Sequence, residues 1–331
     1  MVSRRDIAAR AGVSEMTVTR VVTGKGYVSE KTRQLVQKCV DEMSYIPNKI
    51  AANLVSRKSN AIAVILPDLT NPYYMQLVEE MISEAKRRGQ IVMLFRANEG
   101  EINSVLDDII SNRVCGVVNM ALFEVPIKYV KQMQAMGMRL VHGGYDDDKF
   151  SVRMNYAPAM KRAFELFRRD GRKKVAFIAG FGEHQVEHDS RIRFFREYCK
   201  EFGYGEESSP ILRGNYPAEK IYVVGRTLAD ELLNEHPDVD AVFCLNDMMA
   251  FGAVNCFKGK GLSIPQDMAV VGFDNLQISE YFDPPLTTIA ADIKAEAKAY
   301  VDYIGGDIEG GVCTLDCELH LRKSLREREG E

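Results

Sequence analysis

Several absences narrow the functions open to this chain of 331 residues. No apolar run of signal-peptide length occurs near the start, and nowhere do about eighteen apolar residues follow one another without a charge, so no membrane span is expected. The seven cysteines show no zinc-ligand spacing and are typical of reduced thiols. No phosphate-binding loop, GxSxG elbow or dinucleotide fingerprint is present. These absences predict a cytoplasmic protein that is not an enzyme and has no cofactor or metal.

Charge is divided unevenly along the sequence. Residues 1–58 contain 11 Lys and Arg against 5 Asp and Glu, a balance of +6. The remaining residues contain 32 against 42, a balance of −10, so that the two parts sum to the net charge of −4. A basic segment on an acidic body is expected when only that segment meets a polyanion.

The basic segment has the capping residues of three short helices. Ser3, Ser14 and Ser29 are predicted N-caps, and Gly12 and Gly24 are predicted to end the first two helices. Two helices joined by a tight turn, with a third packed beneath them, form a helix-turn-helix.

The second of these helices would be the recognition helix, because residues near the N-terminus of such a helix meet base edges in the major groove. The candidate base contacts are Glu15, Met16, Thr19 and Arg20, and the candidate phosphate or structural contacts are Thr17 and Thr23. Arg20 can make a bidentate contact with guanine. The alternative is an amphipathic helix of a three-helix protein module, in which Arg20 is only solvated.

From residue 61 onward, apolar segments alternate with amphipathic ones. The predicted strands are Ile62–Leu66, Ile91–Phe95, Gly116–Met120, Arg139–His142, Val175–Ala179, Ala241–Leu245 and Ala269–Phe273. The predicted helices are Tyr74–Arg88, Asn103–Asn112, Ala159–Arg168, Arg191–Phe202, Ile221–Glu235 and Asp247–Lys260. Strands that are apolar throughout indicate parallel sheets covered on both faces, and so many units favour two α/β lobes that face each other across a cleft.

Several segments of the sequence resemble the lactose-repressor (LacI/GalR) family of transcriptional regulators, in the family's order and over essentially the whole chain. They are AGVSEMTVTRVV, VSEKTRQLV, the segment Tyr45–Leu54, PDLTNPYY, FCLNDMMAFGA and IPQDMAVVGFDN…PPLTTI. The resemblance implies an all-α helix-turn-helix headpiece and an α/β periplasmic-binding-protein-like core of two parallel-sheet lobes. The implied divisions are a headpiece over 1–46, a hinge helix and linker over 47–60, and a core over 61–331. Crossovers near residues 156, 290 and 318 would divide the core into an N-lobe of about 61–156 and 290–318 and a C-lobe of about 157–289 and 319–331.

The resemblance also implies a hinge helix that folds on operator DNA. Leu54 would insert into the minor groove and kink the central base step; packing of Leu54 against a dimer mate or the core is the alternative. The full set of expected DNA contacts is Arg4, Arg5, Ser14, Glu15, Met16, Thr17, Thr19, Arg20, Thr23, Tyr27, Asn48, Ala51 and Leu54. A pseudo-palindromic operator requires two heads, so a homodimer is expected.

Matched residue by residue, the resemblance implies an effector site between the lobes. Its expected members are Tyr73, Tyr74, Asn98, His184, Glu187, Arg191, Asn246 and Asp274. Fixed polar groups beside aromatic faces suit a polyhydroxylated ligand such as a sugar or sugar derivative. The structural alternatives are that Asn246 caps the following helix and that Asp274 caps a turn.

The chain departs from the sugar-binding members at a few positions. Ala291 stands where the lactose repressor has glutamine, Met120 replaces an asparagine, and Gly143-Gly144 lie near a usual aspartate. These differences leave open a purine or nucleoside effector, or a protein co-effector.

Residues 184–188, with the sequence HQVEH, fit the H-x-x-E-H pattern of inverted zinc peptidases. That chemistry needs both histidines on one helical face. We interpret the segment as a loop before a helix that begins at Ser190, which favours contact with the effector; a metallohydrolase or sugar-binding enzyme is the alternative from another class. As a whole the sequence predicts a repressor of carbohydrate uptake or catabolism genes that a small polar effector controls.

Overall fold

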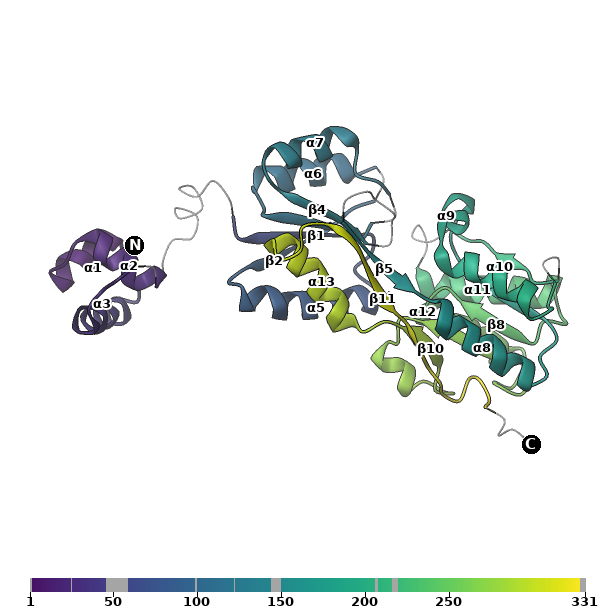
Figure 1. Cartoon of the computed structure of the whole chain (residues 1–331). Coiled ribbons are helices and arrows are strands. Elements are labelled where there is room, and N and C mark those ends of the chain that lie inside the picture. Colours follow the sequence, from purple (N-terminus) through teal and green to yellow (C-terminus); the bar gives the residue numbers. More distant parts are fainter. Residues whose placement is uncertain are drawn as a thin grey trace. The chain divides into compact units, whose positions relative to one another are not determined.

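A computed structural model describes residues 2–24, 26–45, 59–98, 100–121, 123–143, 150–205, 208–215 and 220–327. The chain divides into two compact units, residues 1–59 and residues 60–331, each built around its own core (Figure 1).

The first unit has three helices among its described residues, as the sequence predicted. They are α1 (Arg4–Ala11), α2 (Glu15–Thr23) and α3 (Glu30–Glu42). The hydroxyl oxygens of Ser3, Ser14 and Ser29 each accept a hydrogen bond from the backbone N–H three residues later, at 3.2–3.3 Å, which satisfies a donor that the helix leaves unpaired. The fully buried core residues are Ile7, Val18 and Val36.

The second unit contains two six-stranded sheets. The first has the order β11-β5-β4-β3-β1-β2 with parallel pairings throughout. Its strands are β1 (Ala61–Leu66), β2 (Ile91–Arg96), β3 (Gly116–Asn119), β4 (Arg139–Gly143), β5 (Phe150–Asn155) and β11 (Gly311–Asp316). One face is covered by α5 (Pro72–Arg87) and α13 (Ile293–Gly305), and the other by α6 (Ile102–Ser111) and α7 (Ile127–Ala135). We call this sheet and its helices the N-lobe.

The second sheet, with its helices, forms the C-lobe. Its order is β12-β10-β9-β8-β6-β7, and only β12 runs antiparallel to its neighbour among the described pairings. Its strands are β6 (Val175–Ile178), β7 (Ile211–Leu212), β8 (Ala241–Cys244), β9 (Ala269–Phe273), β10 (Thr287–Ala290) and β12 (Glu318–His320). Its helices are α8 (Ala157–Arg169), α9 (Glu183–His188), α10 (Ser190–Glu201), α11 (Ile221–Glu235), α12 (Asp247–Gly259) and the 3-10 helix η1 (Gln277–Glu280).

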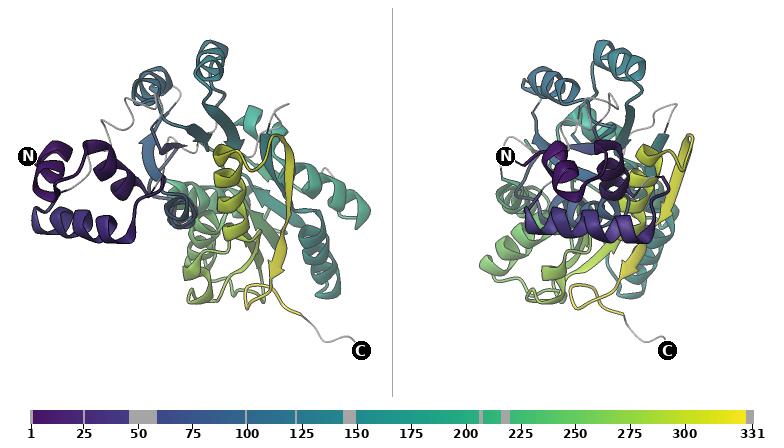
Figure 2. Two further views of the ribbon diagram at one scale, coloured as in Figure 1. Left: turned by 60° about the vertical axis from the view of Figure 1, so that its left-hand side comes forward. Right: turned by 90° about the vertical axis from the view of Figure 1, so that its left-hand side faces the viewer.

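The chain passes between the two sheets three times. It does so from β5 to α8, from β10 to α13, and from β11 through Cys317 to β12. Figure 2 shows β11 and β12 as one continuous segment that runs along both lobes. Because β5 pairs with β11 and β10 pairs with β12, the crossing segments lie beside one another and form a common hinge between the lobes.

Two glycines allow α11 and α12 to pack backbone against backbone. A Cβ atom at Gly225 would lie 2.3 Å from the carbonyl oxygen of Met249, and one at Gly252 would lie 2.2 Å from that of Tyr222. Any larger residue would therefore push the helices apart. This close packing fixes the N-terminus of α12 at the carboxyl ends of β8 and β9, where the cleft is expected.

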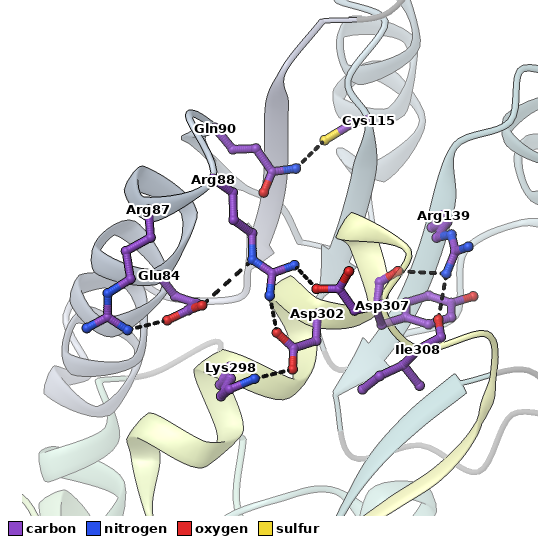
Figure 3. A network of polar contacts seen from close by, with 11 residues as sticks. Glu84, Arg87, Arg88, Gln90, Cys115, Arg139, Lys298, Asp302, Asp307 and Ile308 are labelled. Atoms are coloured by element: carbon purple, nitrogen blue, oxygen red, sulfur yellow. Dashed lines mark hydrogen bonds and ion pairs between the residues drawn. The ribbon is translucent and has the colours of Figure 1, made fainter.

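The N-lobe helices α5 and α13 lie side by side and are joined at both ends. Near their N-termini, the Tyr73 hydroxyl donates to Glu296. Near their C-termini, Arg88 forms ion pairs with Asp302 and, at 2.7 Å, with Asp307 (Figure 3). The two helices are therefore linked near both of their ends.

The sequence pattern missed several elements: β5, β7, β10, β11, β12, α7, α9 and α13. The interpretation of residues 184–188 as a loop is wrong. Glu183–His188 forms α9, and Asp189 then starts a separate helix by accepting the N–H of Arg191 at 2.8 Å. No described helix combines the length and the apolar character that a membrane span requires.

Candidate DNA-binding face and interlobe cleft

α2 has one buried side and one side open to solvent. Val18 and Val21 pack into the head's core, while Glu15, Met16 and Arg20 are exposed, Met16 to 62%. A methionine with this exposure has no role in the head's own core. These side chains are available for base edges, as a recognition helix requires.

The hydroxyl groups close to this exposed side form hydrogen bonds with other groups of the same helix or of its N-cap. Those of Ser14 and Thr17 lie 2.9 Å apart at the N-cap, Thr19 donates to the Glu15 carbonyl at 2.9 Å, and Thr23 donates to the Thr19 carbonyl at 2.7 Å. A donated hydrogen bond from Thr19 to a base, or from Thr23 to a phosphate, therefore requires the hydroxyl to rotate away from the helix.

The remaining predicted DNA contacts lie elsewhere in the head or outside the described residues. Arg5 and Tyr27 are exposed, Tyr27 to 88%, and Arg4 is half-buried. The hinge candidates Asn48, Ala51 and Leu54 lie outside the described residues.

A cavity of about 30 Å³ lies at the junction of the two lobes. Its lining comes from both lobes and from the crossing segments: Tyr73, Met154, Tyr156, Asp274, Ile289, Ala290, Ala291, Ile293 and Glu296. This volume holds one or two water molecules. In this arrangement of the lobes the cavity is too small for a ring-sized ligand.

Glu296 is the most fully buried charged group of the cavity wall, at 2% exposure. The Tyr73 hydroxyl donates to it at 2.8 Å from each carboxylate oxygen, and the Tyr300 hydroxyl donates to Oε1 at 3.2 Å. Burial raises the pKa of Glu296 to about 7, against these two hydrogen bonds, which favour the charged form. Tyr73 lies at the start of α5 because Asn71 caps that helix and Pro72 occupies its first turn.

Arg191 lies on the C-lobe side, and its charge is matched by Asp189. The two form a paired contact, with Nε 2.9 Å from Oδ1 and Nη2 2.6 Å from Oδ2. Nη1 donates to the Leu245 carbonyl at 2.7 Å. The guanidinium carbon lies 5.6 Å from the ring centre of Tyr156 and 5.5 Å from that of Phe273, so Arg191 also makes cation–π contacts beside the cavity.

Asp274 follows β9 directly and has an unusual backbone. Its φ of 100° and the φ of 49° at Asn275 lie in a region that side-chain-bearing residues rarely adopt. Burial, with the charge of Asp247, raises the pKa of Asp274 well above its ordinary value, and Arg191 opposes that rise. The turn therefore holds a carboxyl group at the cavity wall at a conformational cost.

Of the predicted effector contacts, Tyr73 and Asp274 line the cavity and Arg191 stands beside it. Tyr74 is buried in the N-lobe core. Asn98 is half-buried and its carbonyl accepts from Glu101 after β2. Asn246 caps α12 by accepting the Met249 N–H at 2.9 Å. Glu187 accepts from Arg196 at 2.8 and 3.0 Å, and the side chain of His184 is not described.

Sequence reasoning missed Glu296, Tyr156 and Asp189. Glu296 had a usable signal, because it lies with Ile293, Ala297 and Tyr300 on the inward side of α13, where an acid is unexpected. Tyr156 and Asp189 gave no such signal: each lies in a short connection whose position depends on the packing of two elements.

The H-x-x-E-H segment is helical, as a zinc site would need, but its glutamate is engaged elsewhere. Glu187 binds Arg196 and also lies 3.8 Å from Arg213. Within the described part of the chain, no three His, Cys, Asp or Glu side chains gather closely enough to hold a metal ion.

Comparison with known proteins matches both units. Residues 5–48 match the family model of the bacterial regulatory proteins, lacI family, and residues 164–329 match a periplasmic binding protein-like domain. The chain is 31% identical to the HTH-type transcriptional regulator DegA of Bacillus subtilis (strain 168), over 87% of this chain and 86% of that protein.

Two solved structures resemble the whole chain. The lac repressor dimer bound to operator and the anti-inducer ONPF has a TM-score of 0.81 and 25% identity, covering 98% of this chain and 99% of that one. A complex of the transcriptional regulator CelR with cellobiose has a TM-score of 0.68 and 25% identity, covering 98% and 100%. With its helix-turn-helix head and its two-lobed effector-binding core, the chain belongs to the lacI family of bacterial regulatory proteins and is a DNA-binding transcriptional regulator.

Proposed function

We propose that this regulator represses genes of carbohydrate uptake or catabolism and is controlled by a small polar effector, a sugar or sugar derivative, bound between its lobes. The observation that carries the proposal is the convergence of Tyr73, Arg191, Asp274 and Glu296 on a cavity beside the three crossings. Polar groups that converge within aromatic and apolar walls are typical of small-molecule sites. The sugar-bound CelR structure supports this choice of ligand.

The helix α5 offers a route from the cavity to the linker. At one end, Tyr73 binds Glu296. Beyond the other end, the Gly89 carbonyl accepts the side chain of Asn60 at 2.5 Å, where the core begins. An effector that prefers one arrangement of the lobes would shift α5 and with it the base of the linker.

A homodimer would supply the two heads that a pseudo-palindromic operator needs. β2 is an edge strand of the N-lobe sheet, and its Ile91 and Leu94 are 49% and 43% exposed. On the neighbouring α5, Ile82 is 48% exposed. Apolar side chains gathered at a sheet edge support association with a second copy.

A purine or nucleoside is the second candidate effector. Met154 and Ala291 line the cavity where a sugar would need polar partners, and the rings of Tyr73 and Tyr156 offer flat faces to a base.

The test begins with selection of genomic DNA fragments by the full-length chain, followed by titration of the selected operator. Arg20→Ala should weaken operator binding roughly 5- to 150-fold and leave binding to unrelated DNA nearly unchanged, because a base contact is lost. Arg10→Ala is the matched control, since Arg10 is an exposed cation of α1 paired with Glu42 at 3.2 Å. Leu54→Ala should lose most operator affinity and keep non-specific binding.

Release or tightening of the complex by a hit from a thermal-shift screen of sugars, nucleosides and purines would support control by an effector. If the chain selects no DNA sequence, the proposal that it is a sequence-specific regulator is wrong. If no screened compound changes the operator complex, the proposal that a small molecule controls it is wrong.

A further inference from the structure

A second pocket, of about 250 Å³, lies in the C-lobe between α10 and the edge strand β7, and it shares no described lining residue with the cavity at the hinge. Its polar lining consists of Arg196, Ser209 and Arg213, and its apolar lining includes Phe195 and Ile211. None of the described lining residues is acidic. Pockets for drug-sized molecules begin at about 300 Å³, so this one suits a small ligand.

The two arginines of this pocket converge on one carboxylate oxygen. Arg196 Nη2 lies 2.8 Å from Glu187 Oε1, and Arg213 Nη2 lies 3.8 Å from the same atom. The hydrogen bond and the charge of Arg196 lower the pKa of Glu187, so this carboxylate is ionised. Its oxygen therefore marks a position where an anion is within reach of both guanidinium groups.

The acids of α9 match these arginines only in part. Arg213 lies 3.8 Å from Glu187 and 3.9 Å from Glu183, both beyond hydrogen-bond distance, and no described group accepts a hydrogen bond from its guanidinium. The side chains of Glu183 and Glu187 are 79% and 44% exposed. Because ion pairs this open to solvent contribute little to stability, either acid can turn to water at small cost.

Ser209 gives an independent sign of a ligand. It is only 6% exposed, and its hydroxyl oxygen has no hydrogen-bond partner among the residues that the structure describes. A buried polar group without a partner is rare in folded proteins and indicates a place that a water, an ion or a ligand completes. Ser209 precedes β7 and Arg213 follows it, so the short strand holds both residues at the same pocket.

We infer that this pocket binds a phosphate group, as free phosphate or as part of a small phosphorylated metabolite, through Arg196, Arg213 and Ser209. Arginine forks and a hydroxyl are the donors that phosphate oxygens require. Phosphate displaces Glu187, because a group that carries up to two negative charges and contacts both guanidinium groups is held more strongly than a carboxylate that binds one of them. The site lies outside the cavity at the hinge, so the inference goes beyond the proposed function and does not depend on it.

Titration of the full-length chain with inorganic phosphate and with glycerol 3-phosphate, followed by phosphorus NMR at constant ionic strength, tests the inference. Arg196→Ala and Arg213→Ala should each weaken binding roughly tenfold, because each removes charged hydrogen-bond donors. Arg193→Ala is the matched control: Arg193 is an exposed cation of α10 that lies 4.9 Å from the ring centre of Phe194, outside the pocket, and its removal should leave binding unchanged.

Tighter binding of glycerol 3-phosphate than of phosphate assigns the site to a metabolite, and equal or weaker binding assigns it to the free ion. A chain that binds neither probe overturns the inference. Binding that both arginine variants retain also overturns it, because the phosphate then lies elsewhere, for example on the basic head.

A gain of affinity tests the competition with Glu187. Glu187→Gln removes the competing charge and should strengthen phosphate binding about threefold. Glu197→Gln removes an exposed acid of α10 that does not line the pocket and should leave binding unchanged. Unchanged or weaker binding by Glu187→Gln would show that phosphate does not displace this carboxylate and would overturn that part of the inference.

If the arginine variants fail to fold, Ser209→Ala still decides. It should weaken phosphate binding severalfold and leave the free energy of unfolding of the phosphate-free chain unchanged or higher, because the lost hydroxyl has no described partner there. A less stable variant that binds phosphate as tightly as the parent would show that Ser209 is structural, which overturns its place in the site.

Discussion

Asp247 in the C-lobe and Arg88 in the N-lobe each hold several elements together, and the two side chains differ in kind. In the C-lobe, Asp247 is completely buried and accepts from the Leu276 N–H at 2.9 Å and from the hydroxyls of Ser279 and Thr288 at 2.6 Å each. Its three donors come from the turn after β9, from η1 and from β10.

In the N-lobe the corresponding side chain is Arg88, which keeps 23% of its side-chain surface exposed. Its guanidinium group reaches Glu84, Asp302 and Asp307, and Lys298 joins Asp302 at 2.5 Å (Figure 3). Asp247 is thus a desolvated acceptor, and Arg88 is the centre of a partly solvated cluster of ions. The first should be strong and insensitive to salt, and the second modest and salt-dependent.

Removal of the Asp247 carboxylate should have the largest effect. Asp247→Ala leaves three buried donors without an acceptor, at about 1–3 kcal/mol for each, so we expect a loss of roughly 4 kcal/mol in the free energy of unfolding, measured by urea titration. Asp247→Asn retains an acceptor oxygen and should lose less than half as much. A loss below about 1 kcal/mol for the alanine variant would show that water replaces the lost acceptor.

The next largest effect on the free energy of unfolding should come from the protonation of Glu296, because this acid is buried in the N-lobe. A carboxyl group whose pKa rises from 4.5 when unfolded to about 7 when folded stabilises the fold fully at low pH. That contribution is lost as the pH rises through this interval, by up to roughly 3 kcal/mol.

Glu296→Gln removes this dependence. The free energy of unfolding of the variant minus that of the parent should therefore increase from pH 4.5 to pH 7. The exposed Glu280→Gln is the control and should give a difference that is flat across this range. If the difference in unfolding free energy for Glu296→Gln also stays constant with pH, then the pKa of Glu296 in the folded state is its ordinary value.

Arg88→Met tests the ionic side of the comparison. The variant keeps the packing of the stem and removes the charge, and we expect a loss of about 1 kcal/mol at low salt that shrinks in 1 M NaCl. Arg87→Met is the control, because Arg87 is 74% exposed and pairs only with Glu84 among the described residues. A loss that salt does not change would show that Arg88 acts through its hydrogen bonds rather than its charge.

The exposed edge of the N-lobe should contribute least to the stability of a single chain. Leu94→Ser is expected to change the unfolding free energy by no more than about 0.5 kcal/mol, yet it should weaken the proposed dimer measurably in analytical ultracentrifugation. The control is Ile127→Ser on α7, where the side chain is 67% exposed. If both variants weaken the dimer equally, or neither does, β2 is not part of the dimer interface.

Local sequence signals predicted the head and the central strands of both sheets well. Serine caps mark the helix starts of the head, and the uninterrupted apolar runs of β1 and β8 mark strands buried on both faces. The edge strand β11 lacks this signal: residues 311–316 are all exposed or half-buried, so the segment does not stand out as apolar. β11 is specified by its pairing with β5 rather than by its own composition.

The cleft was predictable only in part, for a related reason. Tyr73 and Asp274 follow from family motifs, but Glu296 and Tyr156 join them because β10, α13 and β5 carry the chain from one sheet to the other. No local pattern encodes that crossing. A site assembled from separate crossings becomes visible in the sequence only after the topology is known.

The order of strands also has a consequence for how the protein is made. The N-lobe sheet lacks its edge strand β11 until residue 316 has been synthesised, and the C-lobe sheet lacks β12 until residue 320. The head, by contrast, is complete by residue 45. During translation a complete DNA-binding head therefore emerges from the ribosome well before either sheet of the core is complete, and a truncated chain would keep the head without a complete core.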